Sequence, residues 1–124
     1  MIQNKNLYHP NHLKENSIRE IEDKIELLLI RADYFVQAGD FEHALECYDR
    51  ALEAKPTCID AWIGVGVVYI KENKRTDAEK VFQKVLLMKP DSKRGAIGLA
   101  LANYENGNLN DALEMLRKAD TMKQ

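Results

Sequence analysis

The amino-acid sequence predicts an all-α fold in which three helix-turn-helix units stack into an α-solenoid. The main observation is a regular interval, since Ala44, Ala78 and Ala112 lie 34 residues apart. Periods of this length are typical of stacked helical units rather than of one irregular core. The composition agrees with a single helical domain, because the 124 residues are 45% hydrophobic and 31% charged and include only three prolines.

Aligned at this interval, the chain divides into repeats at about residues 25–58, 59–92 and 93–124. Each column of the alignment tends to hold one kind of residue. The shared columns are small (Ala32, Gly66, Ala100), turn-forming (Gly39, Asn73, Gly107), large and apolar (Tyr48, Phe82, Leu116) or apolar (Ala51, Val85, Ala119), and Pro56 matches Pro90.

The N-terminal residues 1–16 have few apolar positions and are predicted to form a flexible arm ahead of a repeat domain at 17–124. Ser17 and Glu20 form a capping box, which predicts that the first helix begins at Ser17 and runs to about Ala38. Apolar residues then recur at spacings of three and four, as on one face of a helix: Ile18, Ile21, Ile25 and Leu28. This helix is longer than the later ones, so its early turns form an extension that could cap the open end of the stack.

The turns inside the repeats follow from residues that accept a left-handed backbone. Gly39, Asn73 and Gly107 occupy the position after each first helix, where a positive φ satisfies the last carbonyl groups. Asp40 and Asn108 are the expected N-caps of the helices that follow. Apolar stripes place these second helices back on the first ones: Leu45, Tyr48 and Leu52; Val81, Phe82 and Val85; Leu113, Leu116 and Ala119.

Small residues are expected where the two helices of each repeat cross. The predicted pairs are Ala32 with Ala44, Gly66 with Ala78, and Ala100 with Ala112. Trp62, Tyr69 and Phe82 are interpreted as core of the middle repeat. Three residues depart from the column pattern, namely Arg31 in an apolar column and the smaller Ala96 and Asn103 in the columns of Trp62 and Tyr69.

Period and pattern resemble the tetratricopeptide repeat (TPR) family over about 100 residues. The second repeat fits best, with Trp62, Gly66, Tyr69, Ala78, Phe82 and Pro90. The resemblance implies a right-handed superhelix whose first helices line a concave, peptide-binding groove. By this resemblance the groove residues are Leu29, Asp33, Val36, Ile63, Val67, Ile70, Arg94, Ile97, Leu101 and Tyr104, with Glu26 and Asp60 in the column of Arg94 and with Gly64 and Gly98 in the floor.

One subgroup of the family grips the C-terminal carboxylates of chaperones with a clamp of Lys, Asn, Asn, Lys and Arg. The resemblance places these five columns at Leu29, Asp33, Gly64, Arg94 and Gly98. Only Arg94 keeps comparable chemistry, and Asp33 would repel a carboxylate. We therefore expect no binding of chaperone tails through such a clamp.

Several classes of function find no support in the sequence. The net charge is −2 and no segment is basic enough to bind a phosphate backbone, so no nucleic-acid partner is expected. No apolar run is long enough to span a bilayer or to act as a secretory signal, which makes the cytoplasm the expected location unless a segment has been removed. Cys47 and Cys58 have no clustered partner, and His9 and His12 have no third ligand nearby, so no metal is expected.

We also expect no enzyme activity and no cofactor. His43 is the only histidine in the repeats, and it has no nucleophile at a recognised spacing. Glycines of residues 64–66 and 95–98 lie inside helical segments, whereas a phosphate-binding loop joins a strand to a helix.

Function is therefore expected at the surface, and three hypotheses remain. The leading one is a protein-interaction module, an adaptor or scaffold that binds an apolar peptide or an amphipathic helix through Ile63, Val67, Ile97 and Leu101, with Asp33 and Arg94 orienting the ligand. A substrate-holding chaperone is a related possibility by resemblance to three-repeat chaperones of bacterial secretion systems. The alternatives are self-assembly through the last helix (Leu109, Leu113, Met115, Leu116, Met122) and a groove closed by the arm through Leu7 and Tyr8.

Overall fold

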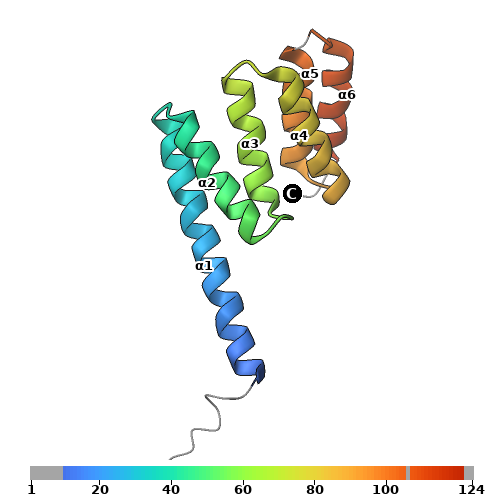
Figure 1. Cartoon of the computed structure of the whole chain (residues 1–124). Helices are drawn as coiled ribbons and strands as arrows, with labels where there is room; N and C mark the ends of the chain where they lie inside the picture. The colour runs from blue at the N-terminus through green and yellow to red at the C-terminus, as the bar shows by residue number, and fades with distance from the viewer. Residues whose placement is uncertain (1–9, 106, 122–124) are drawn as a thin grey trace, which may run out of the picture.

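The structure, a computed structural model, describes residues 10–105 and 107–121 and confirms the predicted all-α solenoid. Its helices form three antiparallel pairs that stack side by side (Figure 1). They are α1 (Pro10–Gln37), α2 (Phe41–Ala54), α3 (Ile59–Lys71), α4 (Arg75–Met88), α5 (Lys93–Glu105) and α6 (Leu109–Asp120). Each helix packs on the next, and α3 also contacts both α1 and α5, so the first helices of the repeats form one continuous layer.

The three turns inside the repeats have the same backbone structure. Gly39, Asn73 and Gly107 have φ values of 77°, 62° and 84°, which confirms the predicted left-handed residues. In each turn the next amide N–H donates to the carbonyl five residues before it, from Asp40 to Phe35 and at the two equivalent positions, at 2.8 Å each. This bonding satisfies the last carbonyls of α1, α3 and α5 and reverses the chain.

The predicted N-caps differ in how they act. Asp40 caps α2, because its carboxylate accepts the backbone N–H of His43 at 3.2 Å and lies 2.7 Å from His43 Nδ1. The backbone hydrogen bond holds the pKa of Asp40 below its usual value, and the side-chain hydrogen bond from His43 to Asp40 raises the pKa of the imidazole. Asn108 occupies the cap position of α6, but its side-chain amide donates to the carboxylate of Asp111 and does not cap the backbone.

The predicted start of the first helix is wrong. Helix α1 begins at Pro10, so Ser17 lies inside the helix instead of at its N-cap, and residues 10–16 of the expected arm are helical. A proline is well accommodated in the first helical turn, where its missing N–H would have no partner in any case. Residues 1–9 of the expected arm, with Leu7 and Tyr8, lie outside the described residues.

The early turns of α1 run past the end of α2 and away from the stack (Figure 1). Residues 15–24 are exposed throughout, including Ile18 and Ile21. The expectation that these turns cap the open end of the stack is therefore wrong.

The core consists of two clusters that join neighbouring repeats. The first cluster joins α1 and α2 to α3, and the second joins α3 and α4 to α5. Tyr48 and Phe82 occupy the same column in these clusters and are both buried. Each aromatic ring faces a glycine of the next repeat, because a Cβ built on Gly64 would lie 2.2 Å from Tyr48 and one on Gly98 would lie 2.2 Å from Phe82.

The aromatic residues of the middle repeat do not share one environment. Phe82 is core, as predicted, with 1% of its surface exposed. Trp62 and Tyr69 are half-buried at the edge of the core. Trp62 donates its indole N–H to the carbonyl of Pro56 at 2.9 Å, and Lys84 Nζ lies 4.3 Å from the centre of a Trp62 ring.

Candidate functional site

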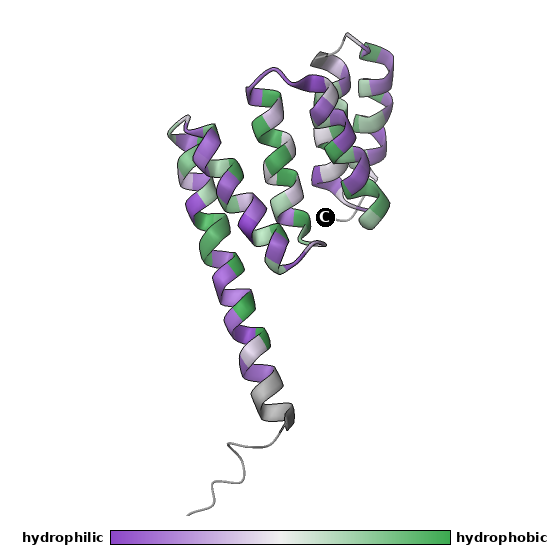
Figure 2. Cartoon of the chain, viewed as in Figure 1, coloured by the Kyte–Doolittle hydropathy of each residue, from purple (hydrophilic) through white to green (hydrophobic). Residues whose placement is uncertain are grey.

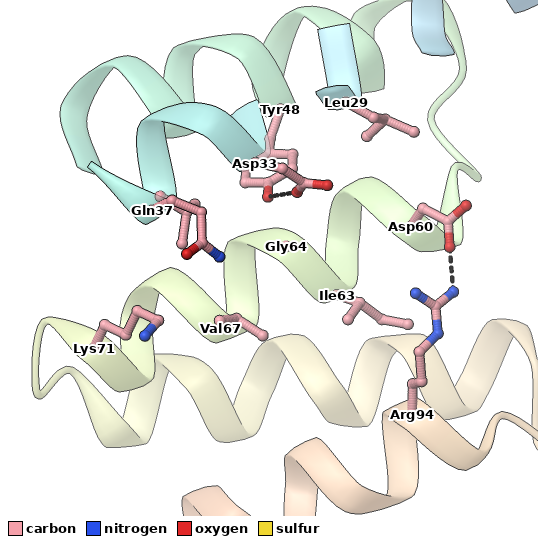
Figure 3. A pocket seen from close by; sticks show the side chains of 11 residues that line it. Leu29, Asp33, Gln37, Tyr48, Asp60, Ile63, Gly64, Val67, Lys71 and Arg94 are labelled. Atoms are coloured by element: carbon pink, nitrogen blue, oxygen red, sulfur yellow. Dashed lines mark hydrogen bonds and ion pairs between the residues drawn. The ribbon is translucent and has the colours of Figure 1, made fainter. Parts of the chain in front are cut away.

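A groove runs along the inner layer of helices and begins with a cavity of about 660 Å³ between α1, α2, α3 and the start of α5 (Figure 3). The cavity is lined by residues at helical spacing on α1 and α3 that face the same side, and Gly64 lets the Tyr48 ring approach between them. Its lining residues are Leu29, Asp33, Val36, Gln37, Tyr48, Asp60, Ile63, Gly64, Val67, Lys71 and Arg94.

A second cavity of about 220 Å³ continues this groove from α3 across to α5. It shares Ile63, Val67 and Arg94 with the first cavity, so the two are parts of one surface. Its other lining residues are Ile70, Phe82, Ile97, Gly98 and Leu101. Apart from Arg94 the second cavity is lined by apolar side chains and one glycine, and Figure 2 shows that α3 is hydrophobic along most of its length.

The structure brings nine of the ten groove residues expected from the sequence into these two cavities. Leu29, Asp33 and Val36 lie in the first cavity, Ile70, Ile97 and Leu101 lie in the second, and Ile63, Val67 and Arg94 lie in both. Tyr104 does not join them. It lines a separate hollow between α5 and α6, which Leu101 also borders.

The two groove charges singled out in the sequence both have partners within the protein. Arg94 reaches from α5 to α3 and forms an ion pair with the carboxylate of Asp60 (Figure 3). Asp33 accepts a hydrogen bond from the Tyr48 hydroxyl at 3.1 Å. Burial, with the nearby Asp33 charge, raises the pKa of Tyr48, so this phenol stays protonated as the donor.

The sequence reasoning missed three residues of the first cavity, namely Tyr48, Gln37 and Lys71, and it assigned Phe82 of the second cavity to the core alone. Gln37 and Lys71 lie 34 residues apart, so the repeat interval carried a signal for them. They lie at one end of the cavity, opposite the Asp60–Arg94 pair (Figure 3). Tyr48 comes from a second helix, and its ring reaches the groove beside Gly64 of the next repeat.

The described part of the chain offers few chemical groups for other kinds of site. Cys47 and Cys58 are both buried free thiols. No group of three or more His, Cys, Asp or Glu side chains among the described residues is arranged to hold a metal ion. Among the same residues, no helix combines the length and the apolar character needed to cross a membrane.

The fold and the groove define a helical-repeat protein with a concave inner surface. A family model described as tetratricopeptide repeat matches residues 35–96, which is half of the chain. The chain therefore belongs to the tetratricopeptide repeat family, whose members serve as protein-interaction modules.

Relatives of known identity are distant in sequence. A peroxisomal targeting signal receptor of Kluyveromyces lactis is 25% identical over 109 residues, which are 88% of this chain and 19% of the receptor. A TPR repeat-containing protein of Methanocaldococcus jannaschii is 28% identical over 107 residues, which are 84% of this chain and 19% of that protein. The chain thus spans about one fifth of the length of these relatives.

Solved structures share the fold at low sequence identity. The second TPR of Spaghetti (RPAP3), bound to the HSP90 peptide SRMEEVD, has a TM-score of 0.75 and 21% identity, with coverage of 90% of this chain and 98% of that one. The TPR2AB domain of yeast Sti1, in a complex with an HSP90 peptide, has a TM-score of 0.73 and 21% identity over 90% of this chain and 45% of that one. MamA has a TM-score of 0.69 and 22% identity over 77% of this chain and 56% of that one.

Proposed function

We propose that this chain is a non-catalytic adaptor that binds an apolar peptide or an amphipathic helix in the groove between α1, α3 and α5. The observation that carries the proposal is the shared centre of the two cavities, where Ile63 and Val67 of α3 border both. Ile97 and Leu101 extend this apolar floor along α5. Pockets that follow one another along such a groove suit side-chain anchors of a helix or an extended segment.

The charges of the groove support an apolar ligand over a ligand held by a terminal carboxylate. Arg94 is the cation that lines both cavities, and Asp60 already neutralises it. Asp33 keeps a negative charge at the other wall of the first cavity. A ligand carboxylate that pairs with Arg94 would have to displace Asp60 and approach Asp33, and both steps cost free energy. Lys71, the other cation of the first cavity, lies at the end opposite Arg94 and does not line the second cavity (Figure 3).

The first test uses ligands selected from a display library of random peptides with the wild-type chain as bait. We expect the selected peptides to carry apolar residues at spacings of three and four. We expect Val67→Asp to weaken their binding at least about tenfold, since it places a charge in the floor that both cavities share. Isothermal titration calorimetry measures this loss, and circular dichroism checks that the variant is folded.

The matched control is Leu87→Asp, which places the same charge on α4 at a side chain that is 84% exposed and lies outside both cavities. Leu101 is unsuitable for this test because it also borders the hollow between α5 and α6. Equal binding by wild type, Val67→Asp and Leu87→Asp would show that the ligand does not use the groove.

Peptides that end in Glu-Glu-Val-Asp are expected not to bind, although the RPAP3 and Sti1 structures hold HSP90 peptides. Of the five clamp columns only Arg94 is basic here, and it is paired with Asp60. We expect no saturation up to about 1 mM in a fluorescence anisotropy titration, which is the weak end of specific recognition. The double variant Asp33→Asn, Asp60→Asn removes both acids and should bind more tightly than wild type. Micromolar affinity of the wild type, abolished by Arg94→Ala, would contradict this prediction.

A further inference from the structure

The large apolar side chains that are exposed gather mainly at the two ends of the stack. The N-terminal face is the outer side of α1, where Leu27, Ile30 and Tyr34 are 57%, 60% and 69% exposed. The C-terminal face is the outer side of α5 and α6, with Leu101, Tyr104, Leu109, Leu113 and Leu116. Among the described residues, only Ile18 and Ile21 on the extension of α1 and Leu87 on α4 are comparable and lie elsewhere.

The repeat interval shows what the N-terminal face would do in a longer stack. Leu27, Ile30 and Tyr34 lie 34 residues before Ala61, Gly64 and Val68 of α3 and 68 residues before Gly95, Gly98 and Ala102 of α5. In α3 and α5 these positions are wholly or largely buried, and Gly64, Gly95 and Gly98 lie close against side chains of the preceding repeat. The N-terminal face is therefore the surface that the later repeats use to pack on the repeat before them.

The C-terminal face is the other half of the same contact. Leu116 occupies the column of Tyr48 and Phe82, the aromatic residues that face Gly64 and Gly98 of the next repeat. Leu116 is 42% exposed and borders a hollow of about 260 Å³ lined by Ala100, Leu101, Tyr104, Leu109, Ala112 and Leu113. Side chains from the next helix of a stack would fill such a hollow.

Side-chain sizes at the two faces differ from those at the internal contacts. Inside the protein a large aromatic residue faces a glycine, as Phe82 faces Gly98. At the ends the corresponding residues are Leu116 and Ile30. A side chain smaller than that of Phe82 would therefore meet one larger than Gly98. Leucine and isoleucine together are larger than phenylalanine and glycine, so two copies would lie farther apart at this point than neighbouring repeats do.

Charge supports the same pairing and explains the unusual Arg31. Arg31 is equivalent to the buried Val65, and Asp120 is equivalent to Leu52, which packs on the cluster that contains Val65. Two apolar positions of the internal contact thus become a basic and an acidic residue, and both are exposed at the ends. Arg31 disrupts neither the register nor the core of its own repeat, because its column faces the preceding repeat.

We propose that a second copy of this chain covers these faces, so that the C-terminal face of one copy packs on the N-terminal face of the next. Leu116 then meets Ile30, and Asp120 lies near Arg31. The contact is head-to-tail and extends the solenoid instead of closing a symmetric dimer. It covers Leu101 at the end of the groove but leaves the shared centre at Ile63 and Val67 open.

Sedimentation velocity on the full chain tests this assembly over a wide range of concentrations. We expect the mass of the wild type to rise with concentration from the 14.2 kDa monomer and to continue past a dimer. Ile30→Asp and Leu116→Asp, both at exposed positions, should each remain monomeric. An equimolar mixture of the two variants should form a complex of twice the monomer mass, because each retains the face that the other has lost.

The charge pair gives a more specific second test. Arg31→Asp should weaken association at least about tenfold by placing two acids together, and Arg31→Asp with Asp120→Arg should restore it. Val67→Asp changes the groove alone and should associate like wild type, which separates this proposal from the proposed function. The head-to-tail contact would be overturned if the wild type stayed monomeric, or if the mixture of Ile30→Asp and Leu116→Asp formed no dimer. Circular dichroism checks that each variant is folded.

Discussion

Phe82→Ala is expected to lower the free energy of unfolding by about 3–5 kcal/mol, the range typical of truncating a buried phenylalanine. The ring is 1% exposed and lies between α3 and α5, where a Cβ on Gly66 or on Gly98 would meet its atoms. Neither glycine has a side chain that could move into the space left by the ring. The cavity should therefore persist, which places the cost toward the upper part of the range. Urea denaturation followed by circular dichroism measures the change.

Leu87→Ala is the control for this prediction, because Leu87 lies on the same helix and is 84% exposed. Its effect should stay within about 0.5 kcal/mol, as for surface substitutions in general. A loss below about 1 kcal/mol for Phe82→Ala would mean that α5 closes onto α3 and refills the site. Repeats of a solenoid contact only their neighbours, so the variant should also weaken the coupling between the last two repeats and broaden the transition.

The elements that depend on local chemistry could be predicted from the sequence. Gly39, Asn73 and Gly107 adopt the left-handed backbone that their residue types favour, and the 34-residue interval between them fixes the succession of helices. The start of α1 could not be predicted in the same way. Pro10 and Ser17 are both common at helix starts, and the local sequence does not show which of them is used.

The columns of the repeat predict some of the groove residues correctly and miss others. Ile63, Val67 and Ile97 were found because residues 34 apart lie on equivalent faces of successive helices. Tyr48 was missed because its ring reaches the groove from a second helix, through a contact between repeats. Tyr104 does not lie in the groove because it belongs to the last repeat of the stack. Its column lines the groove in the first two repeats, but at the end of the stack it borders the open hollow of the C-terminal face.

Contacts between repeats therefore determine which side chains reach the groove, and Gly98→Ala tests one of these contacts directly. A Cβ at this position would lie 2.2–2.5 Å from three atoms of the Phe82 ring, well inside van der Waals contact. We expect a net destabilisation of about 1–3 kcal/mol from overpacking. Alanine improves helix propensity by about 0.8–1 kcal/mol, so an unstrained site would instead become more stable.

The partner variant Phe82→Leu separates strain from any general effect of the alanine. Leucine at this column reproduces Leu116, the residue that would face Ile30 between two copies. In the Phe82→Leu background, Gly98→Ala should cost less than in wild type, with a coupling of at least about 1 kcal/mol in the double-mutant cycle. Urea denaturation of the four proteins gives this coupling. Additive effects would mean that the ring shifts without cost, and that the pairing of a large residue with glycine is not what holds the repeats in register.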